Sequence, residues 1–109
     1  LLFTMAKTRL DQLFILLQKM PNDQFLNYAL AMEYISINEH DKAIDVLSIL
    51  IENDPNYLAC YYQLAKLLEQ INKDKAIALY KQGVSVAQIQ GDYKTLNEIN
   101  QALLLLEDD

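Results

Sequence analysis

Apolar residues recur at helical spacing from the N-terminal part of the chain to its end. In the first such segment they follow the i, i+3, i+4, i+7 order that places side chains on one face of a helix: Leu10, Leu13, Phe14 and Leu17. This pattern predicts a helix that starts near Thr4 or Thr8 and ends at about Lys19. Pro21 ends it, because the residue before a proline avoids the helical region.

The same periodicity predicts five further helices, whose ends are marked by polar residues and glycine. They cover about 23–37, 41–53, 56–71, 73–90 and 92–106. Asn38 should close the second helix, because asparagine tolerates the left-handed conformation, and Asn72 has the corresponding place after the fourth. Gly91 should close the fifth helix, and Asp92 should cap the sixth.

Each of these helices has one predicted inward face. The second and fourth helices present Asn27, Leu30, Ala31 and Tyr34, and Tyr61, Leu64, Ala65 and Leu68. The third and fifth present Ala43, Ile44, Leu47, Leu50 and Ile51, and Ala76, Ile77 and Tyr80. The last helix has Leu96, Ile99, Leu103 and Leu106 inside and Lys94, Asn97, Glu98 and Gln101 outside, as expected of a helix that closes an array.

A fixed period connects these segments. Pro21 and Pro55 are 34 residues apart, and so are Asn27 and Tyr61, the first inward residues of the second and fourth helices. A period of this size indicates helix–turn–helix units stacked in an array. The alanines on the inward faces are small where neighbouring helices must approach closely.

This pattern resembles the tetratricopeptide repeat family. One copy reads Asn27-x-x-Leu30-Ala31-x-x-Tyr34, followed by Ala43-x-x-x-Leu47 and Pro55. The next copy reads Tyr61-x-x-Leu64-Ala65-x-x-Leu68, followed by Ala76-x-x-x-Tyr80. The match departs from the family at Asn27, where Trp or Tyr is usual, at Asn38 and Asn72, which replace the turn glycine, and at Gly83, where alanine is common.

The resemblance implies an all-α fold of about six helices, in which antiparallel helix pairs stack as a short right-handed superhelix, or α-solenoid. It also implies one domain over residues 1–109. The expected parts are an N-terminal half-repeat helix at 4–20, repeats at 21–55 and 56–90, and a C-terminal capping helix at 91–109.

The resemblance further implies a non-catalytic adaptor that binds a protein or peptide in a concave groove lined by the first helices of the repeats. Helical geometry places a second stripe of side chains away from the core of each such helix. The expected groove residues are Phe25, Tyr28, Met32, Ile35, Ala59, Tyr62, Lys66 and Glu69.

The ligand expected in this groove is apolar or an amphipathic helix. Some family members hold a peptide's C-terminal carboxylate with Lys, Arg and Asn, but the corresponding places here are Tyr28, Met32 and Gln63. A largely apolar second helix suits a helical ligand better. Two alternatives stay open: a terminal segment or the closing helix covers the stripe, or a second copy does so in a homodimer, which the apolar run 103–106 favours.

Composition limits the classes of partner. The net charge is −6 and the nine basic residues are scattered, so we expect neither nucleic acid nor a membrane as a partner. The single cysteine, Cys60, excludes an internal disulfide and a cysteine-rich zinc site, and the reducing cytoplasm is the expected compartment. No apolar run approaches the roughly 20 residues needed to cross a bilayer, and the N-terminal segment is not expected to be a signal peptide.

The chain offers no constellation for catalysis. His40 is the only histidine and falls in a predicted turn, so it has no partners for a triad or a metal site. Cys60 lacks a basic neighbour that would make it reactive and is expected to be a small, partly buried filler. The sequence also lacks a glycine-rich phosphate loop. We therefore predict no enzymatic activity, no cofactor and no metal.

Overall fold

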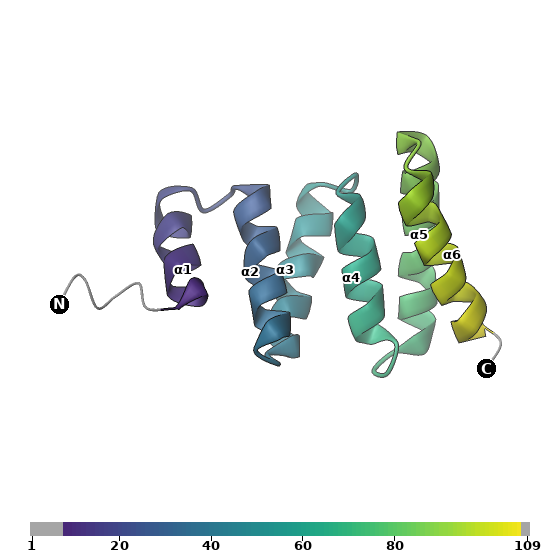
Figure 1. Cartoon of the computed structure of the whole chain (residues 1–109), viewed down its shortest axis with the longest axis horizontal. Helices are drawn as coiled ribbons and strands as arrows, with labels where there is room; N and C mark the ends of the chain where they lie inside the picture. The colour runs from purple at the N-terminus through teal and green to yellow at the C-terminus, as the bar shows by residue number, and fades with distance from the viewer. Residues whose placement is uncertain (1–7, 108–109) are drawn as a thin grey trace. The chain divides into compact units, whose positions relative to one another are not determined.

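The described part of the protein consists of six α-helices joined by short turns. The computed structural model describes residues 8–107, and no strand occurs in this range. The helices are α1 (Arg9–Lys19), α2 (Gln24–Ser36), α3 (His40–Asn53), α4 (Leu58–Leu68), α5 (Lys73–Gln90) and α6 (Tyr93–Glu107), as Figure 1 shows. The all-α fold is therefore confirmed, whereas a start of the first helix at Thr4 lies outside the described residues.

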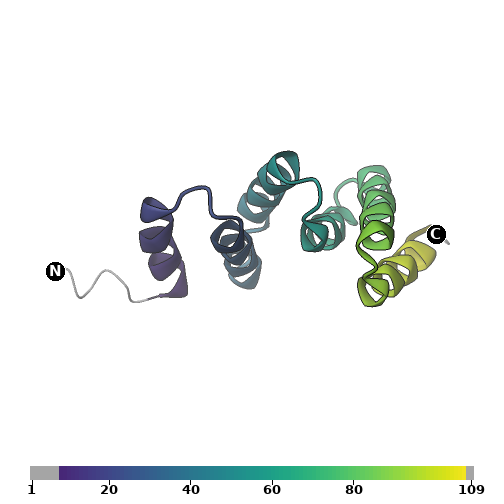
Figure 2. The same ribbon diagram turned by 90° about the horizontal axis from the view of Figure 1, so that it is seen from above.

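The chain divides into two units, Leu1–Leu50 and Ile51–Asp109, and each is described by itself. In the first unit, α1 packs against α2. In the second unit, α4 packs against α5 and α5 against α6, so that three helices share one core. Figures 1 and 2 show these neighbours side by side from two directions.

Several helix ends are capped by side chains or closed by a left-handed residue. Thr8 caps α1 and Asp23 caps α2, each through a side-chain oxygen that accepts a backbone N–H of the first turn. Asn38 and Gly91 adopt left-handed angles, with φ of 63° and 71°. After each of them the chain closes a Schellman motif, in which the next residue's N–H donates to a carbonyl five residues back. These two helix ends therefore depend on residues that tolerate a positive φ.

The prediction for Asn72 is wrong. Its φ is −150°, and its side chain accepts a hydrogen bond from the N–H of Lys75, so it caps the start of α5 instead of closing α4. The helix α4 already ends at Leu68, because the N–H groups of Ile71 and Asn72 both donate to the Leu68 carbonyl in a tight turn. The connection between α4 and α5, residues 69–72, is made without a left-handed residue.

The predicted inward positions of the first unit are only partly correct. Leu30 and Ala31 are buried, but Asn27 and Tyr34 are half-buried, and the buried residue of the first turn of α2 is Leu26. The Asn27 amide donates to the carbonyls of Pro21 and Asp23, at 3.0 and 2.8 Å. Its two hydrogen bonds therefore stabilise the turn before α2, and Asn27 is not a core residue.

An equivalent hydrogen bond to the preceding turn occurs 34 residues later. Tyr61, which is 34 residues after Asn27, donates its hydroxyl hydrogen bond to the carbonyl of Pro55 at 2.7 Å. In both places the acceptor is the proline six residues before the donor. A polar asparagine and an aromatic tyrosine therefore make the same kind of contact at equivalent positions of the two copies.

In the second unit the three helices meet at Gly83. A Cβ atom at this position would lie 3.0 Å from Ile99 Cδ1 of α6 and 3.2 Å from Tyr61 Cβ of α4. The absence of a side chain thus lets α5 approach both neighbours. The most completely buried side chains around this crossing include Tyr80 and Ile99, each with no exposed surface.

The closing helix α6 is less polar outside than predicted. Ile99 and Leu103 are buried, and the polar residues Lys94, Asn97, Glu98 and Gln101 are exposed as expected. However, Tyr93, Leu104 and Leu105 are also exposed, by 66%, 64% and 74%. An apolar strip therefore remains on this helix next to its polar residues.

Candidate functional site

The expected groove residues fall into two sets that belong to different units. Phe25, Tyr28, Met32 and Ile35 lie on α2 in the first unit. Ala59, Tyr62, Lys66 and Glu69 belong to α4 and the turn after it, in the second unit. We call the first set the α2 stripe and the second set the α4 stripe.

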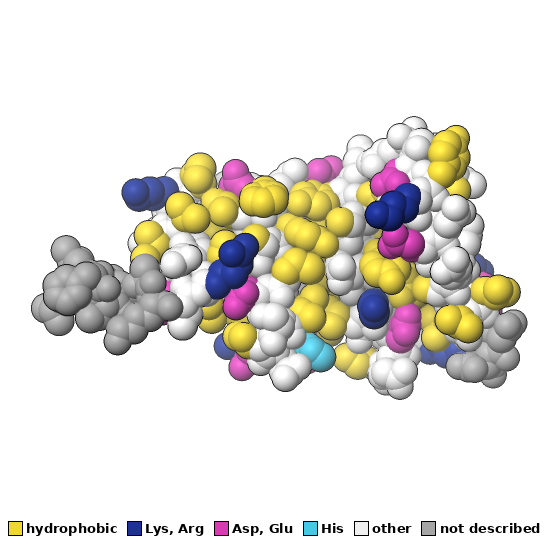
Figure 3. All heavy atoms as spheres, viewed as in Figure 1, with side chains coloured by type: hydrophobic (Ala, Val, Ile, Leu, Met, Phe, Trp, Pro, Cys, Tyr) yellow, Lys and Arg dark blue, Asp and Glu magenta, His cyan; other side chains and the backbone are white. Residues whose placement is uncertain are grey.

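The α2 stripe is accessible along its length. Phe25 is 72% exposed, while Tyr28, Met32 and Ile35 are half-buried, on a helix whose Leu30 and Ala31 are buried. At its start, Phe25 borders a small cavity of about 170 Å³ between α1 and α2, whose other walls include Leu13, Leu16 and Arg9. Apolar side chains gather over these helices on the face seen in Figure 3.

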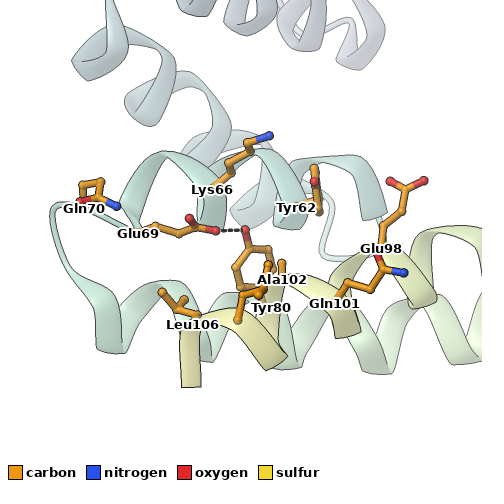
Figure 4. A pocket seen from close by; sticks show the side chains of 10 residues that line it. Tyr62, Lys66, Glu69, Gln70, Tyr80, Glu98, Gln101, Ala102 and Leu106 are labelled. Atoms are coloured by element: carbon orange, nitrogen blue, oxygen red, sulfur yellow. Dashed lines mark hydrogen bonds between the residues drawn. The ribbon is translucent and has the colours of Figure 1, made fainter. Parts of the chain in front are cut away.

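The α4 stripe borders a larger cavity within the second unit, of about 370 Å³. Three of the four predicted residues line it, and Ala59 does not. The cavity takes one wall from α4 and the turn after it, its floor from Tyr80 of α5 and its other wall from α6 (Figure 4). Its lining residues are Tyr62, Lys66, Glu69, Gln70, Tyr80, Glu98, Gln101, Ala102, Leu105 and Leu106.

A hydrogen bond fixes one side of this cavity. The hydroxyl of Tyr80 donates to Glu69 Oε2 at 2.5 Å, as the dashed line in Figure 4 indicates. Burial raises the pKa of the Tyr80 phenol, and the hydrogen bond to Glu69 and its negative charge raise it further. The phenol therefore remains a neutral donor, and the Glu69 carboxylate is held at the cavity wall.

Aromatic contacts fix the other side. The Tyr62 ring lies 6.0 Å from the Tyr80 ring, centroid to centroid. The Lys66 ammonium lies over the Tyr62 ring at 5.8 Å from its centroid, within the range of a cation–π interaction. These contacts hold Tyr62 between a buried phenol and an exposed cation.

Sequence reasoning missed the contribution of α6 to this site. Glu98 and Gln101 were expected only as the polar exterior of a closing helix, and Tyr80 only as core. The structure brings all three to the cavity that the α4 stripe borders. The sequence did contain one signal, the order of the helices. In a stacked array, the helix that follows the pair α4 and α5 packs on that pair.

Cys60 is more buried than the partial burial expected from the sequence. Its side chain is fully buried, and this burial, with a smaller effect of the Asp54 charge, raises the thiol pKa from 9.0 to about 12. The thiol therefore stays protonated at neutral pH and is a poor nucleophile. Cys60 acts as a small core residue.

Other candidate chemistry finds no geometric support among residues 8–107. His40 is exposed and is the first residue of α3 instead of a turn residue. In this range no three His, Cys, Asp or Glu side chains lie close enough together to hold a metal ion. None of the described helices is both long and apolar enough to cross a bilayer.

Comparison with known proteins supports the architecture. No protein-family model matches the chain, and no curated protein sequence matches it. Among solved structures, a solution structure and a crystal structure of a tetratricopeptide repeat domain protein from Salinibacter ruber are each 39% identical to this chain. They cover 81% and 80% of this chain and 90% and 98% of their own, with TM-scores of 0.75 and 0.76.

A third structure is similar in fold only. The solution structure of a protein from Bordetella parapertussis has a TM-score of 0.82 and 23% identity, and the match covers 94% of this chain and 90% of that one. The six helices and these neighbours define a protein of the helical repeat class. With 39% identity over most of both chains, this chain belongs to the tetratricopeptide repeat family.

Proposed function

We propose that this protein is a non-catalytic interaction scaffold that binds a peptide or a helical segment of a partner protein. The observation that supports this proposal most directly is the α2 stripe. Its helix buries Leu30 and Ala31 on one side and still presents Phe25 with 72% of its surface exposed. A helix that is apolar on a second, accessible side is typical of a binding surface.

In this proposal the partner contacts the α2 stripe and the α4 stripe. The α2 stripe supplies two aromatic rings, a thioether and an aliphatic side chain, which suit the apolar face of an amphipathic helix. The proposal keeps the predicted repeats at 21–55 and 56–90. It also keeps a cytoplasmic location, with which a buried, protonated Cys60 is compatible.

Replacing Tyr28 and Met32 together with lysine should weaken peptide binding by more than about tenfold, because two apolar contacts are replaced by charges that must be desolvated. The measurement is the dissociation constant of peptides selected from a displayed random library against the wild-type chain. Both positions are half-buried, so circular dichroism must first establish that the double variant is folded.

The matched control is the double change Ile49→Lys and Ile89→Lys. Both isoleucines are exposed, by 57% and 83%, and lie outside both stripes, while the added charge is the same. Selected peptides should bind this control like the wild type. If the folded Tyr28→Lys, Met32→Lys variant binds them as tightly as the control does, the α2 stripe is not the binding surface.

A second candidate function is self-association. The exposed Leu104 and Leu105 on α6 favour it, because adjacent exposed leucines next to polar residues are typical of a contact surface. Light scattering over a concentration series should then give twice the monomer mass, and Leu104→Lys with Leu105→Lys should restore the monomer. A wild-type mass that stays monomeric at every concentration removes this candidate.

A further inference from the structure

The crevice between α1 and α2 contains a small apolar pocket of about 170 Å³, which we call the α1–α2 pocket. Most of its lining residues are apolar: Leu13 and Leu16 of α1, and Phe25, Leu26 and Ala29 of α2. The two helices pack against each other within the first unit, so the pocket lies inside one unit. The α2 stripe meets this pocket at Phe25.

The pocket has a buried base and an exposed edge. The base is formed by Leu13 and Leu26, which are 5% and 9% exposed. At the edge, Leu16 and Phe25 are 42% and 72% exposed. Ala29, one turn after Phe25 on α2, is the smallest lining residue and leaves the space between them open. Because the edge keeps apolar surface in water, an apolar group that covers it would bind favourably.

The volume of the pocket fits a single apolar side chain. A cavity of about 150 Å³ lined by leucine, isoleucine and phenylalanine stays free of water and binds benzene. The α1–α2 pocket has a similar volume and a similar apolar lining. It can therefore hold one side chain of the size of leucine or phenylalanine.

The pocket lining includes one cation and no carboxylate. The cation is Arg9 in the first turn of α1, and Gln12 is the other polar lining residue. The Arg9 side chain is 68% exposed, and its Nε lies 3.8 Å from Glu33 Oε2, which is beyond hydrogen-bond distance. Within residues 8–107 this side chain donates no hydrogen bond. Its donors are therefore available to a carboxylate of a ligand.

We propose that the α1–α2 pocket holds an apolar side chain of a partner helix, and that Arg9 pairs with an acidic side chain one turn away on that helix. Arg9 and Leu13 are four residues apart on α1, which corresponds to about 6 Å along the axis. The same rise separates residues i and i+4 of a helix that lies along α1. This inference rests on the proposed peptide-binding function, adds α1 to the binding surface and specifies two residues of the ligand.

Charge at the pocket selects the residue next to the apolar anchor. A lysine or arginine at that place would meet Arg9, and like charges repel at contact. The net charge of −6 opposes an acidic residue only weakly, because charges beyond a Debye length of about 8 Å are largely screened at physiological salt. The contact with Arg9 therefore decides the preference.

The test uses the whole chain with methyl-labelled leucine and alanine in an NMR titration. The probes are 3-phenylpropanoate, 3-phenylpropanamide and 3-phenylpropylammonium, which share a phenyl ring and differ in the charge of the head group. The readout is the shift of the methyl signals of Leu13, Leu16, Leu26 and Ala29, which the ring current of a bound phenyl group displaces. The propanoate should bind about three- to fivefold more tightly than the amide, the gain expected of an exposed ion pair, and the ammonium most weakly.

Replacing Arg9 with glutamine should remove the preference for the propanoate and leave the affinity for the amide unchanged. The matched control is Lys19→Gln, which changes the net charge equally at an exposed site in the last turn of the same helix, outside the pocket. This control should keep the preference. Arg9 is exposed, so its replacement keeps the fold and the comparison remains decisive.

Replacing Ala29 with leucine should fill the pocket. This variant should lose at least about fivefold in affinity for all three probes and about tenfold for the peptides selected against the wild-type chain. The matched control is Ala78→Leu, the same change at an exposed position of α5, and it should bind probes and peptides like the wild type. Circular dichroism establishes that both variants are folded.

Four outcomes would overturn the inference. In the wild type they are equal affinity for the propanoate and the amide, and pocket methyl signals that no probe shifts. In the free chain, methyl signals that change on dilution would indicate a second copy in the pocket, and nuclear Overhauser contacts with residues 1–7 would indicate that segment. Each of these leaves the peptide-binding proposal standing, because the selected peptides and the α2 stripe variant test it separately.

The peptides distinguish the two failures. If a folded Ala29→Leu variant binds the selected peptides as tightly as the Ala78→Leu control, the pocket does not anchor the partner, while the proposed function stands. If the library yields no peptide that binds the wild-type chain, the proposed function fails and this inference fails with it.

Discussion

Replacing Leu64 with alanine should lower the free energy of unfolding by about 2–5 kcal/mol, the range for removing a large buried aliphatic side chain. Leu64 is only 2% exposed and lies on α4, where Cys60 and Ala65 are also fully buried. The loss combines the transfer free energy of the deleted carbons with the cost of the cavity they leave. Leu47 on α3, which has no exposed surface, should behave in the same way.

The measurement is denaturant-induced unfolding, followed by far-UV circular dichroism. The control is Ile89→Ala, which deletes the same number of carbons from a side chain that is 83% exposed. That variant should differ from the wild type by less than about 0.5 kcal/mol. A loss below about 0.5 kcal/mol at both Leu64 and Leu47 would show that these side chains are not core residues.

Enlarging Ala76 to leucine should destabilise the protein by about 1–3 kcal/mol, because the added carbons must displace packed neighbours. Ala76 has no exposed surface and lies on α5, the helix that packs against both α4 and α6. Alanine and leucine differ little in helix propensity, so the change probes packing and not helix formation.

Ala78 offers a matched control two residues further along α5. It is exposed, so Ala78→Leu makes the same chemical change on the solvent side of the same helix. Its free energy of unfolding should stay within about 0.5 kcal/mol of the wild type, measured by the same unfolding experiment. Equal losses at both positions would contradict the orientation of α5.

The positions of the helices could be predicted from the sequence because local chemistry sets them. Thr8, Asp23 and Asp92 cap helices through their own side chains, and Asn38 and Gly91 end helices with left-handed angles. Asn72 was assigned to the wrong helix end, because asparagine is equally suited to end a helix and to cap the next one. Only the hydrogen bonds of the turn decide between these roles.

The candidate site was predictable in part. Tyr62, Lys66 and Glu69 of the predicted α4 stripe share one side of the chain and line one cavity, since helical spacing fixes which residues share a face, but their role in binding stays a prediction. The opposite wall, with Glu98 and Gln101, could not be found in this way, because it belongs to a helix about 30 residues away whose packing is a tertiary property. The role of Tyr80 as donor to Glu69 depends on the same packing.

The sequence by itself determined the family, the six helices and most of the core, because apolar spacing follows from helical geometry and a 34-residue period indicates stacked helix pairs. The tertiary structure decided which polar groups meet. It gave Asn27 and Tyr61 equivalent acceptors, the carbonyls of Pro21 and Pro55, and it left Gly83 at the crossing of three helices. It also brought polar side chains of α4, of the turn after it and of α6 to one cavity, because side-chain partners are set by the packing of whole helices and not by neighbours in the sequence.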